Sequence, residues 1–113
     1  MTPTEIDRKL ALAIGYRPED VKVYSDGSVG VVRHEPYGNG GKVWRYQKVF
    51  SHQDPTVILP IMERYDCHSF PLAEGGFEAF VWSSVFVHAY AKHTNPRTAA
   101  ALAVIKAKEV GLI

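Results

Sequence analysis

The apolar positions along the chain change between a helical spacing and a strand-like alternation. The first helical set follows Thr2-Pro3-Thr4-Glu5, a capping-box pattern in which Thr2 accepts from a first-turn amide and Glu5 reaches back. Gly15 supplies the left-handed residue that commonly ends a helix. We therefore predict an N-terminal helix, and its apolar stripe consists of Ile6, Leu10, Ala13 and Ile14.

Two β-rich runs follow this helix and are separated by a turn. Val21–Tyr24 and Val29–Arg33 flank the Asp-Gly pair of Ser25–Ser28, which predicts a hairpin. The glycines of Glu35–Gly41 predict a flexible loop. Aromatic and β-branched residues dominate Lys42–Phe50, which we expect to be a third strand.

The middle of the chain repeats the cap-and-proline pattern at Asp54-Pro55. Pro60 removes an internal hydrogen bond, so the predicted helix is either kinked or begins near Pro60. Cys67–Leu72 and Phe77–Trp82 predict a strand, a turn and a strand, and Val85–Ala91 predicts one more strand. The apolar set of the middle helix is Val57, Ile58, Ile61, Met62 and Tyr65.

The last helix is predicted from the Asn95-Pro96 cap to about Val110, and Gly111 closes it. Its apolar residues surround most of the circumference: Ala99, Ala100, Ala101, Leu102, Ala103, Val104, Ile105, Ala107 and Val110. A helix that is apolar nearly all round is usually buried on more than one side. In a small domain this pattern predicts contact with a second copy, so we expect a homo-oligomer.

The length and composition agree with one domain over residues 1–113, because 113 residues with 46% hydrophobic content build one core but not two. No repeat or linker divides the chain. We predict an α+β fold: a compact, layered α/β sandwich with one mostly antiparallel sheet. Its helices would lie at the N-terminus, in the middle and at the C-terminus.

The charge balance removes several classes of partner. A formal net charge of +1 gives no simple electrostatic argument for binding nucleic acid or a membrane surface. The single cysteine has no internal disulfide partner, and the N-terminus has no signal-peptide pattern. Since no apolar run approaches the ~20 residues of a membrane span, we expect a soluble cytoplasmic protein with no membrane partner.

Three segments that together span most of the chain share the pattern of a known family. They are the opening helix Ile6–Tyr16, the central Asp54-Pro55 with Leu59–Met62, and the closing Asn95–Ala100. In these segments the chain resembles the small phage proteins of the NinX-like family and the related phage α/β/α-sandwich domain. The closing segment is the most specific, since that family enters its last helix through Asn-Pro, a basic residue and small residues. The chain departs from the pattern at Leu59, where a tryptophan is expected. The resemblance implies a phage or prophage accessory protein without an assigned reaction, acting in the cytoplasm of a bacterial host.

The candidate metal ligands do not have the spacing of a metal site. No pair has the CxxC or HExxH pattern, and neighbours such as Cys67 and His68 in a strand point to opposite faces. We therefore predict no metal and no cofactor. The residues considered are His34, His52, His68, His88, His93 and Cys67.

Cys67 has two interpretations, a nucleophile paired in space with His52 or His88, or an inert buried thiol. No nucleophile signature surrounds it, which favours the inert thiol. Since no nucleophile, base and orienting group stand at a recognisable spacing, we predict that the chain is not an enzyme.

The start of the last helix is the strongest candidate ligand site. Helix-start amides attract anions, and Asn95, Arg97 and Thr98 add an amide, a guanidinium and a hydroxyl group there. In the simpler interpretation Asn95 only caps the helix and Arg97 extends into solvent.

A second candidate is the strand Lys42–Lys48, which interleaves three cations with two aromatic residues. Trp44 would stack on a ring while Arg45 contacts a phosphate. Strand alternation separates these two residues onto opposite faces, so the competing interpretation for Trp44 is a core position. Gly38–Gly41 lacks the lysine and Ser/Thr of a phosphate-binding loop, which favours a simple hairpin connection.

These observations lead to two hypotheses about function. The first is a non-enzymatic, oligomeric phage protein that binds a host component, such as a phosphate-bearing, nucleotide-type defence signal, at Asn95, Arg97, Thr98, Trp44 and Arg45. The alternative is a protein-binding inhibitor or adaptor of a host or defence protein, which would use an exposed sheet edge or an aromatic surface. A pocket lined by arginine and aromatic side chains would discriminate in favour of the first.

Overall fold

The computed structural model describes residues 1–37, 42–82 and 89–113, and it describes side chains for residues 1–32, 48–82 and 89–113. Within these ranges the chain forms three α-helices, one short 3-10 helix and six strands. In chain order they are α1 (Pro3–Ala13), η1 (Pro18–Asp20), β1 (Val21–Val23), β2 (Val29–Tyr37), β3 (Lys42–Val49), α2 (Pro55–Arg64), β4 (Cys67–Pro71), β5 (Phe77–Val81), β6 (Ala89–His93) and α3 (Pro96–Glu109).

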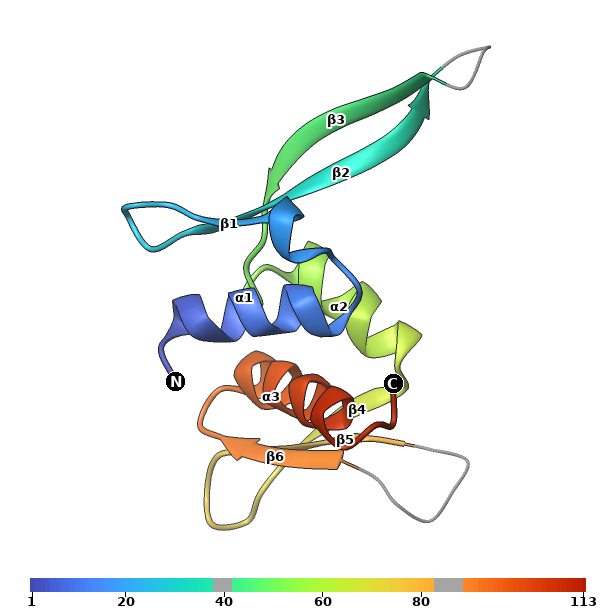
Figure 1. The fold of residues 1–113 in the computed structure, drawn as a ribbon. Helices are drawn as coiled ribbons and strands as arrows, with labels where there is room; N and C mark the ends of the chain where they lie inside the picture. Colours follow the sequence, from blue (N-terminus) through green and yellow to red (C-terminus); the bar gives the residue numbers. More distant parts are fainter. Residues whose placement is uncertain (38–41, 83–88) are drawn as a thin grey trace.

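The elements stack in four layers, which Figure 1 shows from top to bottom. One antiparallel sheet, β1-β2-β3, lies at one end, and a second, β4-β5-β6, lies at the other. Between them are α1 with α2 and, against the second sheet, α3. The α+β class predicted from the sequence is confirmed. The prediction of one sheet is wrong, because the helices lie between two sheets and keep them apart.

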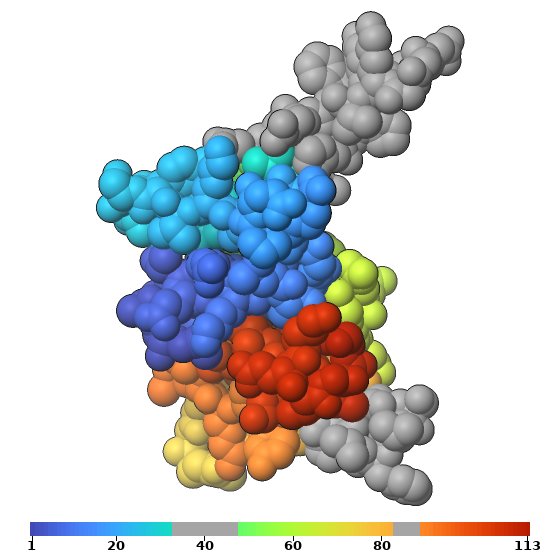
Figure 2. All heavy atoms as spheres, viewed as in Figure 1, coloured from blue at the N-terminus to red at the C-terminus, as the bar shows by residue number. Residues whose placement is uncertain are grey.

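The alanine-rich helix α3 is the central layer of the molecule. It packs on all three strands of the second sheet with one side and on α1 and α2 with the other. Figure 2 shows the atoms of α1 and of α3 meeting directly at the molecular surface. The all-round apolar surface of α3 is therefore covered by its own chain, which removes the reason for expecting a second copy there. Its fully buried alanines are Ala99, Ala100, Ala101, Ala103 and Ala107.

Two helix starts agree with their predicted caps. Thr2 Oγ1 accepts from the Glu5 amide at 3.2 Å, and Asp54 Oδ1 accepts from the Thr56 amide at 2.9 Å. The middle helix thus begins at Pro55, and Pro60 lies inside it, where its ring leaves the carbonyl one turn earlier without an amide donor.

Two strands end more than one residue away from the predicted position. Glu35–Tyr37, expected in a loop, belongs to β2 and pairs with Lys42–Trp44 of β3. The last described strand is Ala89–His93, which ends two residues after the expected end at Ala91. The glycine segment 38–41 and the residues 83–88 lie outside the described residues.

The hairpin of β2 and β3 extends away from the helical body, as Figure 1 shows. Strand β1 pairs with β2 only over Val29–Val31. From the pair Val32–Gln47 to the pair Tyr37–Lys42, β2 and β3 therefore form a two-stranded ribbon. The sheet is three strands wide only at its base, next to α1.

We expect Ala103→Leu to lower the free energy of unfolding by about 1–3 kcal/mol, because three added carbons at a fully buried position strain the closely packed layers. Lys106→Leu is the matched control, since it introduces the same side chain at an exposed position of α3. Its effect should stay within about 0.5 kcal/mol. Urea denaturation followed by circular dichroism measures both changes. Equal unfolding free energies for the two variants would contradict the central position of α3.

Candidate functional site

The N-terminus of α3 is closed by its own cap. Asn95 Oδ1 accepts from the amides of Arg97 and Thr98 at 2.9 and 3.1 Å, and the Ala99 amide donates to the Asn95 carbonyl at 3.0 Å. Pro96 has no amide hydrogen to offer. The sequence analysis expected the helix-start amides to attract an anion, but the first-turn amides are all occupied.

The side chains at this helix start also have partners within the chain. Arg97 Nη1 donates to the carbonyl of Gln53 at 3.0 Å, although Arg97 is otherwise exposed. Thr98 is only 4% exposed, and its hydroxyl contacts other side chains. The structure thus brings Asn95, Arg97 and Thr98 together, but in a capping arrangement that offers an incoming anion no open amide.

Trp44 and Arg45 lie in the two-stranded part of the β2–β3 hairpin. Their register partners are Glu35 and His34. The side chains of these residues lie outside the described part of the chain. Phe50, which follows β3, is buried at 4% exposure and belongs to the core.

The sequence analysis missed a buried polar network that joins α1, the segment before α2 and α3. His52 is 2% exposed, and its amide and Nδ1 both lie against Asp7 Oδ1, at 2.7 and 2.6 Å. On the other side of the ring, Nε2 lies 3.1 Å from Thr98 Oγ1 and 3.0 Å from Gln53 Nε2. Gln53 Nε2 also donates to Thr98 Oγ1 at 2.8 Å.

The donors and acceptors of this network match. The Asp7 carboxylate only accepts, so it holds the proton of His52 on Nδ1, and the single lone pair of Nε2 accepts from the Thr98 hydroxyl, which itself accepts from the Gln53 side-chain amide. The order acid, imidazole, hydroxyl is that of a hydrolase triad. Thr98 is buried, however, and its hydroxyl is engaged on both sides, so the arrangement joins three segments rather than presenting a nucleophile.

We expect Thr98→Val to cost about 1–3 kcal/mol of unfolding free energy, because it removes the buried hydroxyl that donates to His52 Nε2 and accepts from Gln53 Nε2. Thr94→Val is the matched control at an exposed threonine just before the helix cap. Thermal and urea denaturation measure the two effects. Equal stability of the two variants would show that the network contributes nothing to folding.

Cys67 is a buried thiol, as the sequence analysis favoured. Its Sγ donates to the carbonyl of Ala100 at 3.8 Å, and its neighbour His68 lies on the opposite, exposed face of β4, 2.6 Å from Asp66 Oδ1. Burial, assisted by the negative charge of Asp66, raises the pKa of Cys67 to about 12. His52, one of its two suggested partners, is instead bound to Asp7 and Thr98.

We expect Cys67 to resist thiol reagents in the folded protein. A raised pKa keeps the thiol protonated until the pH approaches 12, so at pH 8 about one molecule in ten thousand carries the reactive thiolate. Labelling with dithionitrobenzoate at pH 8 should be at least about a thousandfold slower than in urea. Comparable rates in the two conditions would contradict the burial of this side chain.

A small cavity lies between the end of α1, the base of the first sheet and α2. We call it the α1–α2 pocket, and its volume is about 260 Å³. Its buried floor comes from Val31, Phe50, Val57 and Ile61, and Pro60 lies at its exposed edge. The remaining described residues that line it are Ile14, Tyr16, Lys48 and Arg64.

The end of α1 positions the first wall of this pocket. Gly15 adopts a φ of +112°, which L side chains rarely adopt. The Tyr16 amide then donates back to Ala11 at 3.1 Å and the Gly15 amide to Leu12 at 3.2 Å, a Schellman ending of the helix. This turn brings Tyr16 against Phe50 in an edge-to-face contact, with ring centroids 6.0 Å apart.

The only charged groups among the described residues of the pocket wall are basic. Arg64 ends α2, with its guanidinium 5.0 Å from the ring centroid of Tyr65, and Lys48 extends from β3. Lys48 lies near enough to Asp54 to help lower the pKa of that carboxyl, although hydrogen bonds from Thr56 dominate the shift. The pocket therefore combines an apolar interior with a positive rim.

The sequence analysis counted Lys48 among the cations of the candidate strand Lys42–Lys48, but it singled out neither the pocket nor Arg64. Lys48 and Arg64 are far apart in the chain, and each occupies an ordinary surface position of its element. Among the described residues, no three His, Cys, Asp or Glu side chains gather as metal ligands would. In the same residues, no helix has the length and apolar character that a bilayer span requires.

Comparison with known proteins adds no family assignment. No family model matches the chain, and no curated protein matches it either. The resemblance to the NinX-like phage proteins therefore stays a prediction.

Proposed function

We propose that the chain is a non-enzymatic binding protein that takes a small aromatic anion in the α1–α2 pocket. The observation that carries the proposal is the combination of an apolar cavity with Lys48 and Arg64 as its only charged described lining residues. Concave, mostly apolar sites with a few well-placed polar groups are the usual form of small-molecule sites.

The size of the cavity limits the ligand. An empty protein cavity of about 150 Å³ binds benzene, so the 260 Å³ of this pocket suits a fused pair of rings. Tyr16 and Phe50 offer aromatic surfaces to such a ring. A purine base or a naphthalene therefore fits the interior better than a long chain or a large macrocycle.

The charges of the lining residues limit the choice of ligand further. A basic rim without an acidic lining residue in the described chain favours a ligand with an anionic group beside its ring, either a phosphate or a carboxylate. This keeps the small, phosphate-bearing ligand of the sequence-based hypothesis but assigns it to other residues. A phage context and a host defence signal as the ligand remain part of the hypothesis.

We expect anilinonaphthalene sulfonate, an aromatic anion whose fluorescence rises in apolar sites, to bind the native protein, and adenosine monophosphate to displace it. Adenosine should displace it at least about tenfold less well, because it lacks the charge that Lys48 and Arg64 recognise. Fluorescence titration of the folded protein measures both constants. Equal competition by the two compounds, or none by either, would refute the proposal.

Three substitutions test whether the probe binds through the basic rim and the interior of the pocket rather than through general charge effects. Arg64→Gln should weaken binding of the probe about tenfold. Arg8→Gln, the matched control at an exposed arginine of α1 outside the pocket lining, should leave it unchanged. Ile14→Trp should block the pocket without a change of charge. Unchanged affinity in both Arg64→Gln and Ile14→Trp would show that the probe binds elsewhere.

A further inference from the structure

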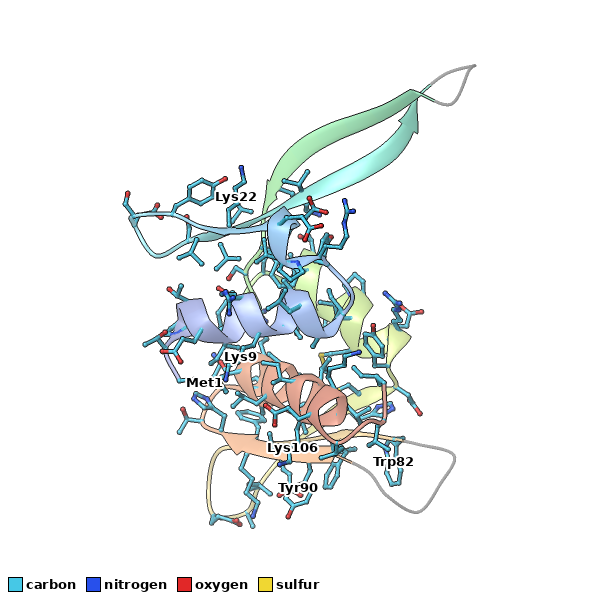
Figure 3. The ribbon with its side chains drawn as sticks, in the orientation of Figure 1. Met1, Lys9, Lys22, Trp82, Tyr90 and Lys106 are labelled. Carbon is cyan, nitrogen blue, oxygen red and sulfur yellow. The ribbon has the colours of Figure 1, made fainter. Side chains whose placement is uncertain are left out.

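The second sheet carries large aromatic residues on the side away from α3. Small residues of its strands, including Ala79 and Ala89, are buried against the helix, and the alternate positions point outward. Figure 3 shows Trp82 and Tyr90 on that outer side. We call this surface the aromatic face, and it consists of His68, Phe70, Phe80, Trp82 and Tyr90.

The rings of the aromatic face form one connected cluster. Phe80 on the middle strand lies 6.2 Å, centroid to centroid, from each of Phe70, Trp82 and Tyr90. His68 stacks on Phe70 at 6.4 Å. The cluster is therefore a continuous patch across three strands rather than a set of scattered surface residues.

The exposed area of this patch is large for a chain of this size. Phe70, Trp82 and Tyr90 are 48%, 53% and 57% exposed. An aromatic side chain contributes about 150–250 Å² when it is buried, so the patch leaves several hundred Å² of mostly apolar surface. Patches of this extent usually mark an interaction surface.

The basic and acidic groups around the patch lie in pairs within the chain. Lys92 Nζ lies 3.4 Å from Glu78 Oε2, and His68 Nε2 lies 2.6 Å from Asp66 Oδ1. Among the described residues, each basic group at the face thus has an acidic neighbour. The face has neither the positive potential that nucleic acid requires nor an excess of charge that selects an oppositely charged protein.

We propose that the aromatic face binds the same face of a second copy of this chain, forming a two-fold symmetric dimer. Register places Phe70, Glu78 and Lys92 in one cross-strand row and His68, Phe80 and Tyr90 in the next. A two-fold axis that lies between the two faces and runs parallel to β5 places β4 of one copy over β6 of the other. Phe70 then faces Lys92 of the other copy, a cation–π contact, and His68 faces Tyr90.

The surface area that two aromatic faces would bury fits a weak dimer. Two aromatic faces in contact, with the rim that they cover, bury on the order of 1,000 Å², the lower limit of specific protein interfaces. Face-to-face packing of two sheets also makes a conventional β-sandwich. The dimer uses neither α3 nor the α1–α2 pocket, so it is independent of the proposed ligand.

Sedimentation velocity between about 1 and about 300 µM, a range that suits a weak interface, tests the dimer. The mass of the wild type should rise from 12.6 kDa towards about twice that value. Trp82→Lys and Tyr90→Lys should remain at the mass of one chain, with unchanged circular dichroism because both positions are exposed. Val23→Lys, at a half-exposed valine of the other sheet, is the matched control and should dimerise like the wild type.

An exchange of the residues at positions 70 and 92 tests how the two copies face each other. Phe70→Lys should weaken the dimer at least about tenfold, because the new cation faces Lys92 of the other copy. The double variant Phe70→Lys with Lys92→Phe should recover most of the affinity, since the cation–ring contact re-forms and position 70 still pairs with Glu78.

Three results would overturn the proposal. The first is a wild type that stays at 12.6 kDa throughout the concentration range. The second is a dimer that persists in both Trp82→Lys and Tyr90→Lys. The third is a single chain whose mass rises only when a single-stranded oligothymidine or an unrelated protein is added, which would assign the face to another partner.

Discussion

The packing of α3 between two layers is the constraint on which the rest of the structure depends. Its alanines lie fully buried against a sheet on one side and against two helices on the other. Small side chains let the backbones approach closely, so the layers share one core although neither is large enough to fold alone. Once α3 is covered on both sides, the two sheets are held at opposite ends of the molecule and cannot join into one.

The buried polar network fixes how the layers are placed on one another. Apolar alanine surfaces tolerate sliding, whereas Asp7, His52 and Thr98 fit only in one mutual arrangement. Each of these groups comes from a different segment, and His52 contacts both of the others. Because the network is buried and its donors and acceptors match, a shift of α1 relative to α3 would leave unsatisfied polar groups inside the protein.

The sequence predicted what local chemistry decides. The caps at Thr2, Asp54 and Asn95, the left-handed Gly15 and the hairpin around Gly27 are each determined by a few neighbouring residues. The features that the sequence did not predict depend on contacts between residues that are far apart in the chain. Nothing near His52 indicates Asp7, which lies 45 positions earlier, and nothing near Arg64 indicates Tyr16 or Lys48. The separation into two sheets likewise follows from how α3 is covered, which no local pattern specifies.

The same dependence explains why the candidate sites lie away from the sequence motifs. The start of α3 looked like an anion site because its local groups suit anions, but folding uses those groups to cap the helix and to hold Gln53. The charged and aromatic groups left for binding are exposed side chains such as Lys48, Arg64, Trp82 and Tyr90, which do not cap a helix or fill the core.

The second sheet shows most directly which side chains the core leaves exposed. The closeness of α3 favours small side chains on the inner face, such as Cys67, Ala79 and Ala89. Apart from Phe77 and Val81 on the inner face, the large apolar residues of these strands are on the outer face, the reverse of the usual distribution in a sheet with one solvated side. Stability of the single chain does not require that reversal, since Tyr90 and Trp82 remain more than half exposed in it. An interface accounts for it, because burial of these rings against another surface gains the hydrophobic free energy that the folded chain leaves unused.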